Sequence, residues 1–347
     1  MLKKIGNMLR WRDWGPGKLS VMFSLLMYIG LCGNKLSSHF ALQCFLLTVA
    51  AAVHCAFGYL VNEWGDREVD HVQGKTNVFQ STKPLPAKLM LTGLLVLAYI
   101  SLAFFFYIKM VAPLWVCWVF LAWAYSLRPI RLKEHGLWGL LASTAAQWTL
   151  PVLLAFAVFE QFGGWDMIAL AVTFSISGGT LEIGHQRYDR QRDQVASAGT
   201  LGVRMRPEEL NTFYKGALLL DKICVGITLL ILSTGLSEVF PWSGSIGPLW
   251  PLLVLYVVVF SFSIRENIRS HRTGAFLDPY YSTDRNAHKF LHETIPNFII
   301  PAYLIVLAAT VQHIFIVLLA FFLVWRIVGG AADWKWPFQF MKNLCQR

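Results

Sequence analysis

Residues 39–70 read HFALQCFLLTVAAAVHCAFGYLVNEWGDREVD, an apolar run followed at once by a polar segment. The run from 39 to 61 contains no Asp, Glu, Lys or Arg, and as a helix it is long enough to cross about 30 Å of hydrocarbon. The polar segment places Asn62, Asp66 and Asp70 four residues apart, and so along one face of a continuing helix. The stretch predicts a transmembrane helix that ends in a row of oxygen ligands.

The rest of the chain repeats the apolar pattern. Of the 347 residues, 56% are hydrophobic and 14% are charged, and the mean hydropathy is +0.50, which is more apolar than a soluble core requires. Runs of this kind lie near 17–33, 39–61, 88–111, 112–127, 137–159, 165–184, 209–235, 246–264, 292–311 and 313–330. We therefore predict an all-α integral membrane protein, a bundle of nine or ten transmembrane helices.

Positive charge is distributed unevenly among the connections between these runs. Most of the 30 Lys and Arg residues fall in alternate connections, whereas the opposite connections hold Lys35 and Lys109. The positive-inside rule then places the amino terminus and the long polar loops in the cytoplasm. The net charge of +10 reports topology and gives no support for a nucleic-acid partner. In a bacterium such a multi-pass protein would lie in the inner or plasma membrane.

The predicted organisation is one helical domain with a single elaborated cytoplasmic face. Residues 1–16 form a basic interfacial segment with no sign of a cleaved signal peptide, 17–311 form the domain, and 312–347 hold an additional transmembrane helix and a tail. The long polar connections are 62–87, 186–207 and 265–291. The six cysteines form no Cys-x-x-Cys pair, and we expect reduced thiols.

A second polar row follows the run at 165–184. Residues 185–193 read HQRYDRQRD, which gives His185, Asp189 and Asp193 the same four-residue spacing. The two rows, which we call the first and second aspartate stripes, occupy equivalent places in the two halves of the chain, as in a pseudo-repeat. Opposed carboxylates of this kind suit Mg²⁺, which also takes phosphate oxygens and water as ligands. The alternative is that the acids are solvated and pair with the interleaved arginines Arg67, Arg187, Arg190 and Arg192.

The two stripes resemble the two aspartate-rich motifs of the UbiA superfamily of intramembrane prenyltransferases. The first is Asn-x-x-x-Asp-x-x-x-Asp from Asn62 to Asp70, and the second is Asp-x-x-x-Asp from Asp189 to Asp193. Three further segments are similar to segments of that family in order and placement: KPLPA at 83–87, YSLRPIRLK at 125–133 and TLGVR at 200–204. The resemblance extends over roughly residues 15 to 311.

The resemblance implies the transfer of a prenyl group from a polyprenyl diphosphate to a small aromatic or lipid acceptor in the membrane, with Mg²⁺ as cofactor. It implies catalytic and metal-binding roles for Asp66, Asp70, Asp189 and Asp193, and a metal-binding role for Asn62. Candidates for binding the diphosphate are Lys83, Arg131, Lys133, Arg204 and Lys75. Acceptor-binding or accessory candidates are His185, Glu182, Tyr125 and Arg128.

Several of these candidates have plain alternatives: Lys83, Arg131 and Lys133 are also explained as ordinary basic residues of cytoplasmic loops. His185 is a metal ligand, a base or merely a histidine at a helix end. Glu182, one turn before Gln186, contacts the acceptor or simply pairs with a basic neighbour.

The sequence departs from the family pattern at several places. Lys83 stands where the family usually has Arg, and a lysine meets a phosphate as a point charge, without the bidentate fork of arginine. Leu127 and Arg128 replace prolines, and residues 74–77 lengthen the first loop. The run at 313–330 would be an extra helix.

These departures leave other reactions open. Within the superfamily the alternatives are terpene cyclisation and phosphoribosyl transfer to a polyprenyl phosphate. Outside it, a transporter is suggested by Asp221 and Lys222, two ionisable residues inside an apolar run. The stripes, however, cluster at one membrane face, away from the midplane, and this placement favours an enzyme.

Overall fold

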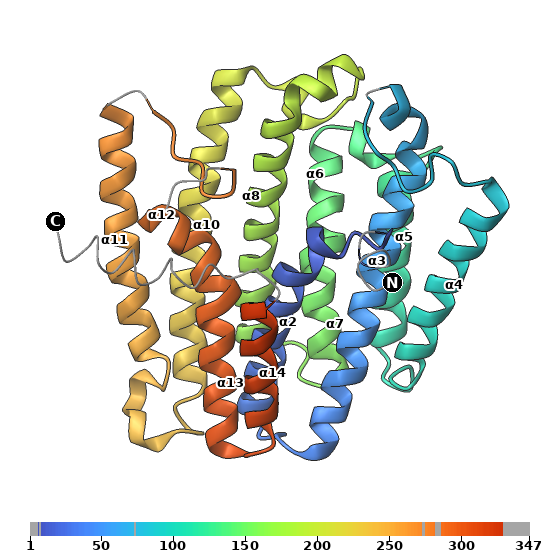
Figure 1. Cartoon of the computed structure of the whole chain (residues 1–347). Coiled ribbons are helices and arrows are strands. Elements are labelled where there is room, and N and C mark those ends of the chain that lie inside the picture. The colour runs from blue at the N-terminus through green and yellow to red at the C-terminus, as the bar shows by residue number, and fades with distance from the viewer. Residues whose placement is uncertain (1–5, 7, 73, 273–274, 282–285, 329–347) are drawn as a thin grey trace. The chain divides into compact units, whose positions relative to one another are not determined.

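The computed structural model describes residues 6, 8–72, 74–272, 275–281 and 286–328 (Figure 1). Across these ranges every regular element is a helix, and one isolated parallel bridge joins Gly136 to Thr200. The predicted all-α class is confirmed. The chain divides into two compact units, the first made of Met1–Gly15 and Leu42–Cys224 and the second of Pro16–Ala41 and Val225–Arg347.

Eight helical segments are long and apolar enough to cross a membrane. They are Trp14–Cys32, Ser38–Val72, Pro84–Ala103, Leu137–Val158, Trp165–Val195, Pro207–Gly235, Pro241–Arg272 and Ala287–Val311. Two shorter apolar helices, Val111–Ser126 and Phe315–Arg326, accompany them within the described ranges. The protein is therefore a multi-pass membrane protein. The count of nine or ten spans and the cytoplasmic orientation stay predictions.

The first unit contains all the residues that the sequence assigns to the site. Its elements are α3 (Ser38–Val72, from Leu42), α4 (Pro84–Ala103), α5 (Val111–Ser126), the 3-10 turn η1 (Leu132–Glu134), α6 (Leu137–Thr144), the π-helical η2 (Ala145–Thr149), α7 (Leu150–Val158), α8 (Trp165–Val195), α9 (Leu201–Arg204) and α10 (Pro207–Gly235, to Cys224). Figure 1 shows the C-terminal ends of α3 and α8 at the same end of this unit.

Apolar packing holds α3, α4 and α5 together. Phe57 and Val61 of α3 form a buried cluster with Ala122 of α5, and leucines of α4 pack against it. A second cluster joins Leu60 of α3 to Ala87 of α4. Inside a bilayer such contacts act through close packing, because lipid tails are as apolar as the side chains.

Three helices continue beyond the apolar runs that predict them. The runs end at 61, 184 and 264, whereas α3 ends at Val72, α8 at Val195 and α11 (Trp250–Arg272) at Arg272. The added residues are mostly polar and include no proline, and the one glycine among them, Gly65, lies within α3 without ending it. Both aspartate stripes therefore lie on regular helix, and the polar connections are shorter than predicted.

The end of α3 has a recognisable stop signal. Gly74 has a φ of +66°, a left-handed conformation that glycine adopts without steric cost. The amide of Lys75 donates to the carbonyl of Asp70 at 2.9 Å, which satisfies a terminal carbonyl of the helix. The chain then turns back towards α4.

The second unit holds α2 (Trp11–Cys32, from Pro16), the end of α10, η3 (Pro241–Ile246), α11, α12 (Ala287–Lys289), the π-helical η4 (Phe290–Ile299), α13 (Ile300–Val311) and α14 (Phe315–Val328). Its core includes Leu252, Tyr256 and Ile295. An edge-to-face contact of Phe23 with Phe322 joins α2 to α14.

Parts of the predicted organisation lie outside the described residues. These are residues 1–5 and 7 of the interfacial segment 1–16 and residues 329–347 of the predicted C-terminal tail. The boundaries at 17, 311 and 312 stay predictions. The five cysteines within the described ranges are thiols and form no disulfide.

Candidate active site

The first stripe lies in a network of buried cations. Asp66 Oδ1 accepts a hydrogen bond from Arg131 Nη2 at 2.9 Å and also binds the ammonium of Lys133. The same ammonium donates to Asn62 Oδ1 at 2.8 Å, and Ser126 Oγ donates to that oxygen at 3.2 Å. The Asp66 side chain is 19% exposed, and those of Arg131 and Lys133 are 8% and 13% exposed. Two cations therefore converge on one largely buried carboxylate.

Arg131 also forms hydrogen bonds to the backbone next to the first stripe. Its Nη1 donates to the carbonyl of Gly65 at 2.7 Å and to that of Ser126 at 3.2 Å. A Cβ on Gly65 would lie 2.5 Å from the Ser126 oxygen, so α3 and the end of α5 approach closely because residue 65 has no side chain. Arg131 additionally pairs with Glu134.

The surroundings of Lys133 act on the pKa of its ammonium in two opposite directions. Burial lowers the pKa of its ammonium below the ordinary value, and the charge of Asp66 and its hydrogen bond oppose that shift. An ammonium held in this way keeps few water contacts, and a nearby anion would replace some of the lost hydration.

Sequence reasoning missed two residues beside this stripe, Glu63 and Asn77. Asn77 Nδ2 donates to Asp70 Oδ2 at 2.7 Å and to the carbonyl of Glu63 at 2.8 Å. The Glu63 carboxylate accepts from the amide of Val78 at 3.0 Å and pairs with Arg10. These contacts fold the loop after α3 back onto the helix. Little in the sequence indicated either residue. Glu63 lies between two stripe residues, and Asn77 lies in a loop without a recognisable motif.

The second stripe is bound by its own helix and the following loop. Arg192 Nη1 contacts Asp189 Oδ1 at 3.2 Å, and His185 Nε2 lies 3.7 Å from Asp189 Oδ2. Thr200 Oγ1 donates to Asp193 Oδ2 at 3.1 Å. The side chains of Arg192 and His185 are 61% and 59% exposed, whereas that of Asp189 is 16% exposed, so the cationic partners are open to solvent and the carboxylate is largely covered.

The interleaved arginines have different partners. Arg67 lies over the ring of Trp64, with Glu68 at 3.9 Å. Arg190 donates to the carbonyls of Gly202 and Met205, each at 2.6 Å. Earlier on α8, Arg187 donates to Asn211 Oδ1 at 2.5 Å. Of these four arginines, Arg192 contacts a stripe carboxylate, that of Asp189, among the contacts described. The alternative that the acids simply pair with neighbouring arginines therefore fits the second stripe better than the first.

A backbone contact joins the surroundings of the two stripes. The amide of Gly136 donates to the carbonyl of Gly199 at 3.0 Å, and Gly136 and Thr200 form the isolated bridge. A Cβ on Gly199 would lie 2.1 Å from the Glu134 oxygen. The segment that carries Lys133 to the first stripe is thus packed on the segment that carries Thr200 to the second.

The remaining diphosphate candidates are placed unequally. Lys75 lies close enough to Asp193 to act on it electrostatically. Arg204 donates to the carbonyls of Gly199 and Glu134, which gives it a place in the backbone contact just described. Lys83 is exposed at the N-cap of α4, and in the described part of the chain no hydrogen bond or ion pair joins its side chain to either stripe. Arg128, proposed for the acceptor, is also exposed.

Glu182 and Tyr125 meet between three helices of the same unit. Glu182 Oε2 accepts from Ser143 Oγ of α6 at 3.0 Å, and Oε1 accepts from Gln186 Nε2 at 3.0 Å. Tyr125 Oη of α5 lies 3.5 Å from Oε1, at the limit of a hydrogen bond. Among the residues the structure describes, no cation pairs with Glu182.

Asp221 and Lys222, which raise the possibility of transport, are a buried ion pair in the first unit. Asp221 Oδ2 lies 2.7 Å from Lys222 Nζ, and Ser177 of α8 donates to Asp221 Oδ1. Pairing and hydrogen bonding offset the cost of burying both charges.

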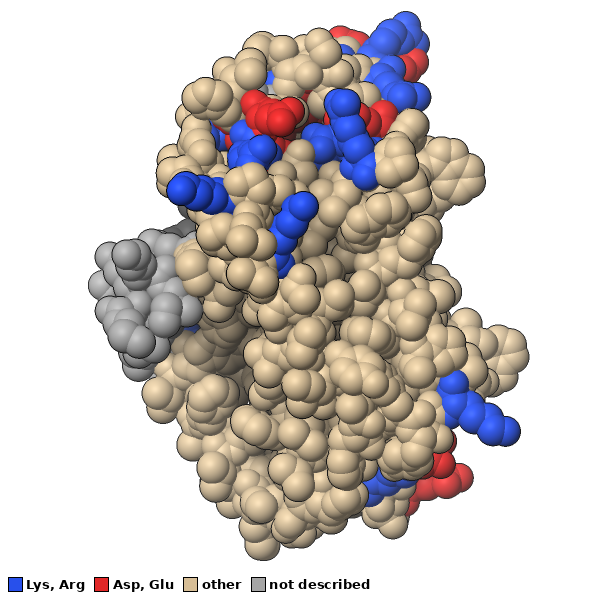
Figure 2. All heavy atoms as spheres, turned by 90° about the vertical axis from the view of Figure 1, so that its right-hand side faces the viewer, with Lys and Arg blue, Asp and Glu red and all other residues tan. Residues whose placement is uncertain are grey.

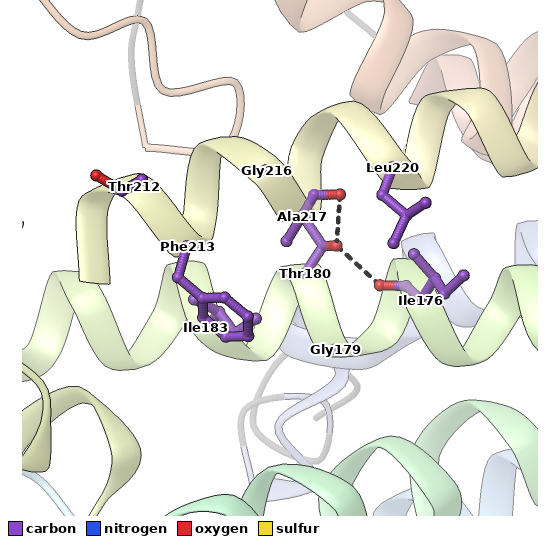
Figure 3. Close-up of a pocket in the computed structure, with 9 residues that line it drawn as sticks. All are labelled: Ile176, Gly179, Thr180, Ile183, Thr212, Phe213, Gly216, Ala217 and Leu220. Carbon is purple, nitrogen blue, oxygen red and sulfur yellow. Dashed lines mark hydrogen bonds between the residues drawn. The ribbon is translucent and has the colours of Figure 1, made fainter. Parts of the chain in front are cut away.

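An apolar pocket of about 490 Å³ lies between α8 and α10 (Figure 3). Gly179 and Gly216 leave it open, and Ile183, Phe213 and Leu220 line it. Its Thr180 hydroxyl donates to the carbonyls of Ile176 and Ala217, so this hydroxyl is engaged within the protein. The pocket suits hydrocarbon and not a charged head group.

Figure 2 shows the face of the molecule that lies to the right in Figure 1. Most of its Lys, Arg, Asp and Glu side chains gather at one end, and a broad band without charged side chains lies beside them. This distribution is typical of a protein whose polar chemistry lies at one boundary of the hydrocarbon layer.

No group of three or more His, Cys, Asp or Glu side chains with metal-site geometry occurs among the described residues. A divalent cation at either stripe would therefore need further ligands. Mg²⁺ ordinarily takes them from water and from substrate phosphates, and the carboxylate and amide oxygens of the stripes are the hard donors that it prefers.

Comparison with known proteins identifies the family. The model of the UbiA prenyltransferase family matches residues 21–276, which is most of the chain. The chain therefore belongs to the UbiA prenyltransferase family, and the predicted resemblance is confirmed.

A curated relative and several solved structures are similar to this chain. The bacteriochlorophyll synthase 33 kDa chain of Rhodobacter capsulatus is 27% identical over 142 residues, which are 38% of this chain and 44% of the relative's length. A UbiA homologue from Archaeoglobus fulgidus bound to GPP and Mg²⁺ superposes with a TM-score of 0.55 at 19% identity, covering 88% of this chain and 99% of its own. A digeranylgeranylglyceryl phosphate synthase gives 0.51 at 17% identity, covering 89% and 99%. At these identities the structures support the fold.

Proposed function

We propose that this protein catalyses the Mg²⁺-dependent transfer of a prenyl group from a polyprenyl diphosphate to an aromatic or lipid acceptor within the membrane. The observation that carries the proposal is that both aspartate stripes lie in one unit, where the segments beside them are joined by the contact of Gly136 with Gly199 and Thr200. Family membership and the homologue bound to GPP and Mg²⁺ support the same assignment.

In this proposal Asn62, Asp66, Asp70, Asp189 and Asp193 hold Mg²⁺ together with the donor diphosphate. The bound ion would supply electrostatic stabilisation to the negative charge that collects on the departing diphosphate. The oxygen donors of the stripes fit such an ion, and the shortage of further protein ligands fits a site completed by phosphate.

Arg131 and Lys133 are the cations best placed to meet the diphosphate. Both already converge on Asp66, and both are largely buried, so an anion placed there interacts through little water. Lys75 is near Asp193 and serves the second stripe. Lys83 and Arg128 are exposed and have weaker support.

The apolar part of the donor would lie among the helices below the stripes. Water has to be kept from the allylic cation, because hydrolysis competes with transfer. The band of the surface without charged side chains in Figure 2 supports a position of these helices in the hydrocarbon layer. The amino terminus and the site are proposed to face the cytoplasm, on the distribution of Lys and Arg.

The test is an assay of membranes that contain the protein, with Mg²⁺, labelled polyprenyl diphosphates of several lengths and a panel of acceptors, followed by mass spectrometry of the products. We expect Mg²⁺-dependent release of diphosphate and a prenylated acceptor. Release of diphosphate with cyclic products alone would replace transfer by cyclisation. Absence of release with every donor, from protein shown to be folded, would contradict the proposal.

A further inference from the structure

Glu182 of α8 is an ionisable residue that lies below the second stripe in the first unit. It lies seven residues before Asp189 on α8, which places it on nearly the same side of the helix and about 10 Å deeper along it. Ionisable side chains at such depth are costly and usually have a function. Glu182 is partly exposed, so part of its surface remains accessible beside its three neighbours.

The neighbours of Glu182 are all neutral donors. Ser143 and Gln186 each donate to it at 3.0 Å, and Gln147 donates in turn to Ser143 at 2.7 Å. Tyr125 is the titratable side chain that faces it, from α5. Within the described chain no basic side chain neutralises the carboxylate, which distinguishes it from Asp66, Asp189 and Asp221. A structural carboxylate at this depth would be expected to have a cation.

A short chain of contacts leads from this carboxylate to the first stripe. Tyr125 precedes Ser126 at the end of α5, and Ser126 Oγ donates to Asn62 Oδ1 at 3.2 Å. Tyr125 is also within electrostatic reach of both Glu182 and Asp66. Glu182 therefore lies about two helical turns below the second stripe and next to a tyrosine that adjoins the first, where the first carbons of a prenyl chain would lie if the head group were bound at the stripes.

We propose that Glu182 binds the hydroxyl group of the acceptor and takes its proton during transfer, an inference that rests on the proposed prenyl transfer. The bond between the allylic carbon and the diphosphate oxygen breaks, and its electron pair leaves with the diphosphate. The hydroxyl oxygen of the acceptor forms a new bond to that carbon, and its proton moves to a carboxylate oxygen of Glu182. Atoms and charge balance without a further reactant.

The same carboxylate restricts the class of acceptor. A hydroxyl group donates to Glu182 and is made more nucleophilic by it. An acceptor that attacks through its own carboxylate would place two anions together in a medium of low dielectric, which is strongly unfavourable. The proposed acceptor is thus an alcohol or a phenol that is alkylated on oxygen.

The experiment compares Glu182→Gln with the wild type, using the donor that the wild type accepts best. Glutamine keeps the shape of the side chain and one of its two acceptor oxygens but cannot take the proton. We expect alkylation of the acceptor to fall at least about 100-fold, the lower range for loss of a general base. The affinity for the donor diphosphate should stay within about threefold, and Mg²⁺-dependent diphosphate release should continue with prenyl alcohol as the product. Glu182→Asp should recover part of the alkylation.

Two controls make the result specific. Asp166→Asn removes a carboxylate at the other end of α8 and should leave all of these quantities unchanged. Paired acceptors with one carbon skeleton, ending in a hydroxyl or a carboxylate, test the acceptor class. Glu182→Gln that alkylates within about threefold of wild type, loss of donor affinity in that variant, or equal use of the carboxylate acceptor would overturn the inference. A wild type that releases no diphosphate would instead remove the proposed function on which it rests.

Discussion

The two aspartate stripes have the same spacing and opposite surroundings. Asp66 is bound by Arg131 and Lys133, whose side chains are 8% and 13% exposed, whereas Asp189 is bound by Arg192 and His185, whose side chains are 61% and 59% exposed. Equal sequence motifs can therefore differ in what they do for the fold. The first stripe is part of the packing between α3 and the end of α5, whereas the Asp189 carboxylate of the second, itself 16% exposed, is paired with cations that are open to solvent.

The largest expected effect separates activity from stability at these two sites. Asp66→Ala and Asp189→Ala should each lower prenyl transfer at least about 100-fold, if each helps to stabilise the departing diphosphate. Only Asp66→Ala should also lower the free energy of unfolding markedly, by about 3 kcal/mol, because it leaves two buried cations without their shared partner.

Thermal unfolding in detergent, measured beside the activity assay, checks this difference. Asp189→Ala should change the free energy of unfolding by less than about 1 kcal/mol, since it leaves no buried cation behind: both of its cationic partners are open to solvent. Glu68→Gln is the matched control, because its side chain is 92% exposed within the same helix. Equal destabilisation by the two alanine variants would show that the stripes do not differ in this way.

Arg131→Lys should have the next largest effect on stability. Lysine keeps the charge beside Asp66 but cannot bond at the same time to the carbonyls of Gly65 and Ser126. Losing these bonds should cost about 2 kcal/mol. The corresponding change at the second stripe, Arg192→Lys, should be nearly neutral in the same unfolding measurement. A neutral Arg131→Lys would mean that charge alone holds the first stripe.

Gly65→Ala tests the close approach beneath the first stripe. The added Cβ would meet the Ser126 oxygen at 2.5 Å, so the end of α5 has to move, at a cost of about 1–3 kcal/mol. Gly93→Ala in α4 is the control, because nothing lies within 4 Å of its Cβ position and alanine favours helix. The two variants should shift the melting temperature in opposite directions, and a shift of the same sign would contradict the contact.

Thr200→Val should have the smallest effect. It removes the hydrogen bond to Asp193 and keeps the shape of the side chain, which should cost about 1 kcal/mol or less. The Mg²⁺ concentration for half-maximal activity should rise no more than about fivefold, because a free energy of about 1 kcal/mol corresponds to a change of about fivefold in a binding constant. A complete loss of activity would indicate that the hydroxyl itself contacts the substrate.

The helices and the stripes could be predicted from the sequence because they depend on local pattern. Apolar runs indicated each of the long helices, and the four-residue spacing placed Asn62, Asp66 and Asp70 on one face. The ends of the helices were less predictable, because hydropathy does not distinguish a polar helical segment outside the membrane from a polar loop. Arg131 and Lys133 entered through family resemblance alone.

Other features depended on contacts between residues distant in the sequence. Asn77 reaches Glu63 across a loop, and no spacing rule connects them. The absence of a cation beside Glu182 within the described ranges could not be inferred either, since α8 has basic residues on the following turn. Lys83 shows the opposite case, a family-like segment whose lysine is exposed and makes no described contact with the stripes.

The most direct measurement is the affinity for a non-hydrolysable prenyl diphosphate analogue, with and without Mg²⁺, for wild type, Asp66→Asn, Asp189→Asn and Glu68→Gln. If both stripes hold the diphosphate through Mg²⁺, binding by the wild type requires the ion and each Asn variant binds at least about tenfold more weakly, which is 1.4 kcal/mol. Glu68→Gln should bind as wild type does. Wild-type affinity in either Asn variant, or binding indifferent to Mg²⁺, would contradict the shared site.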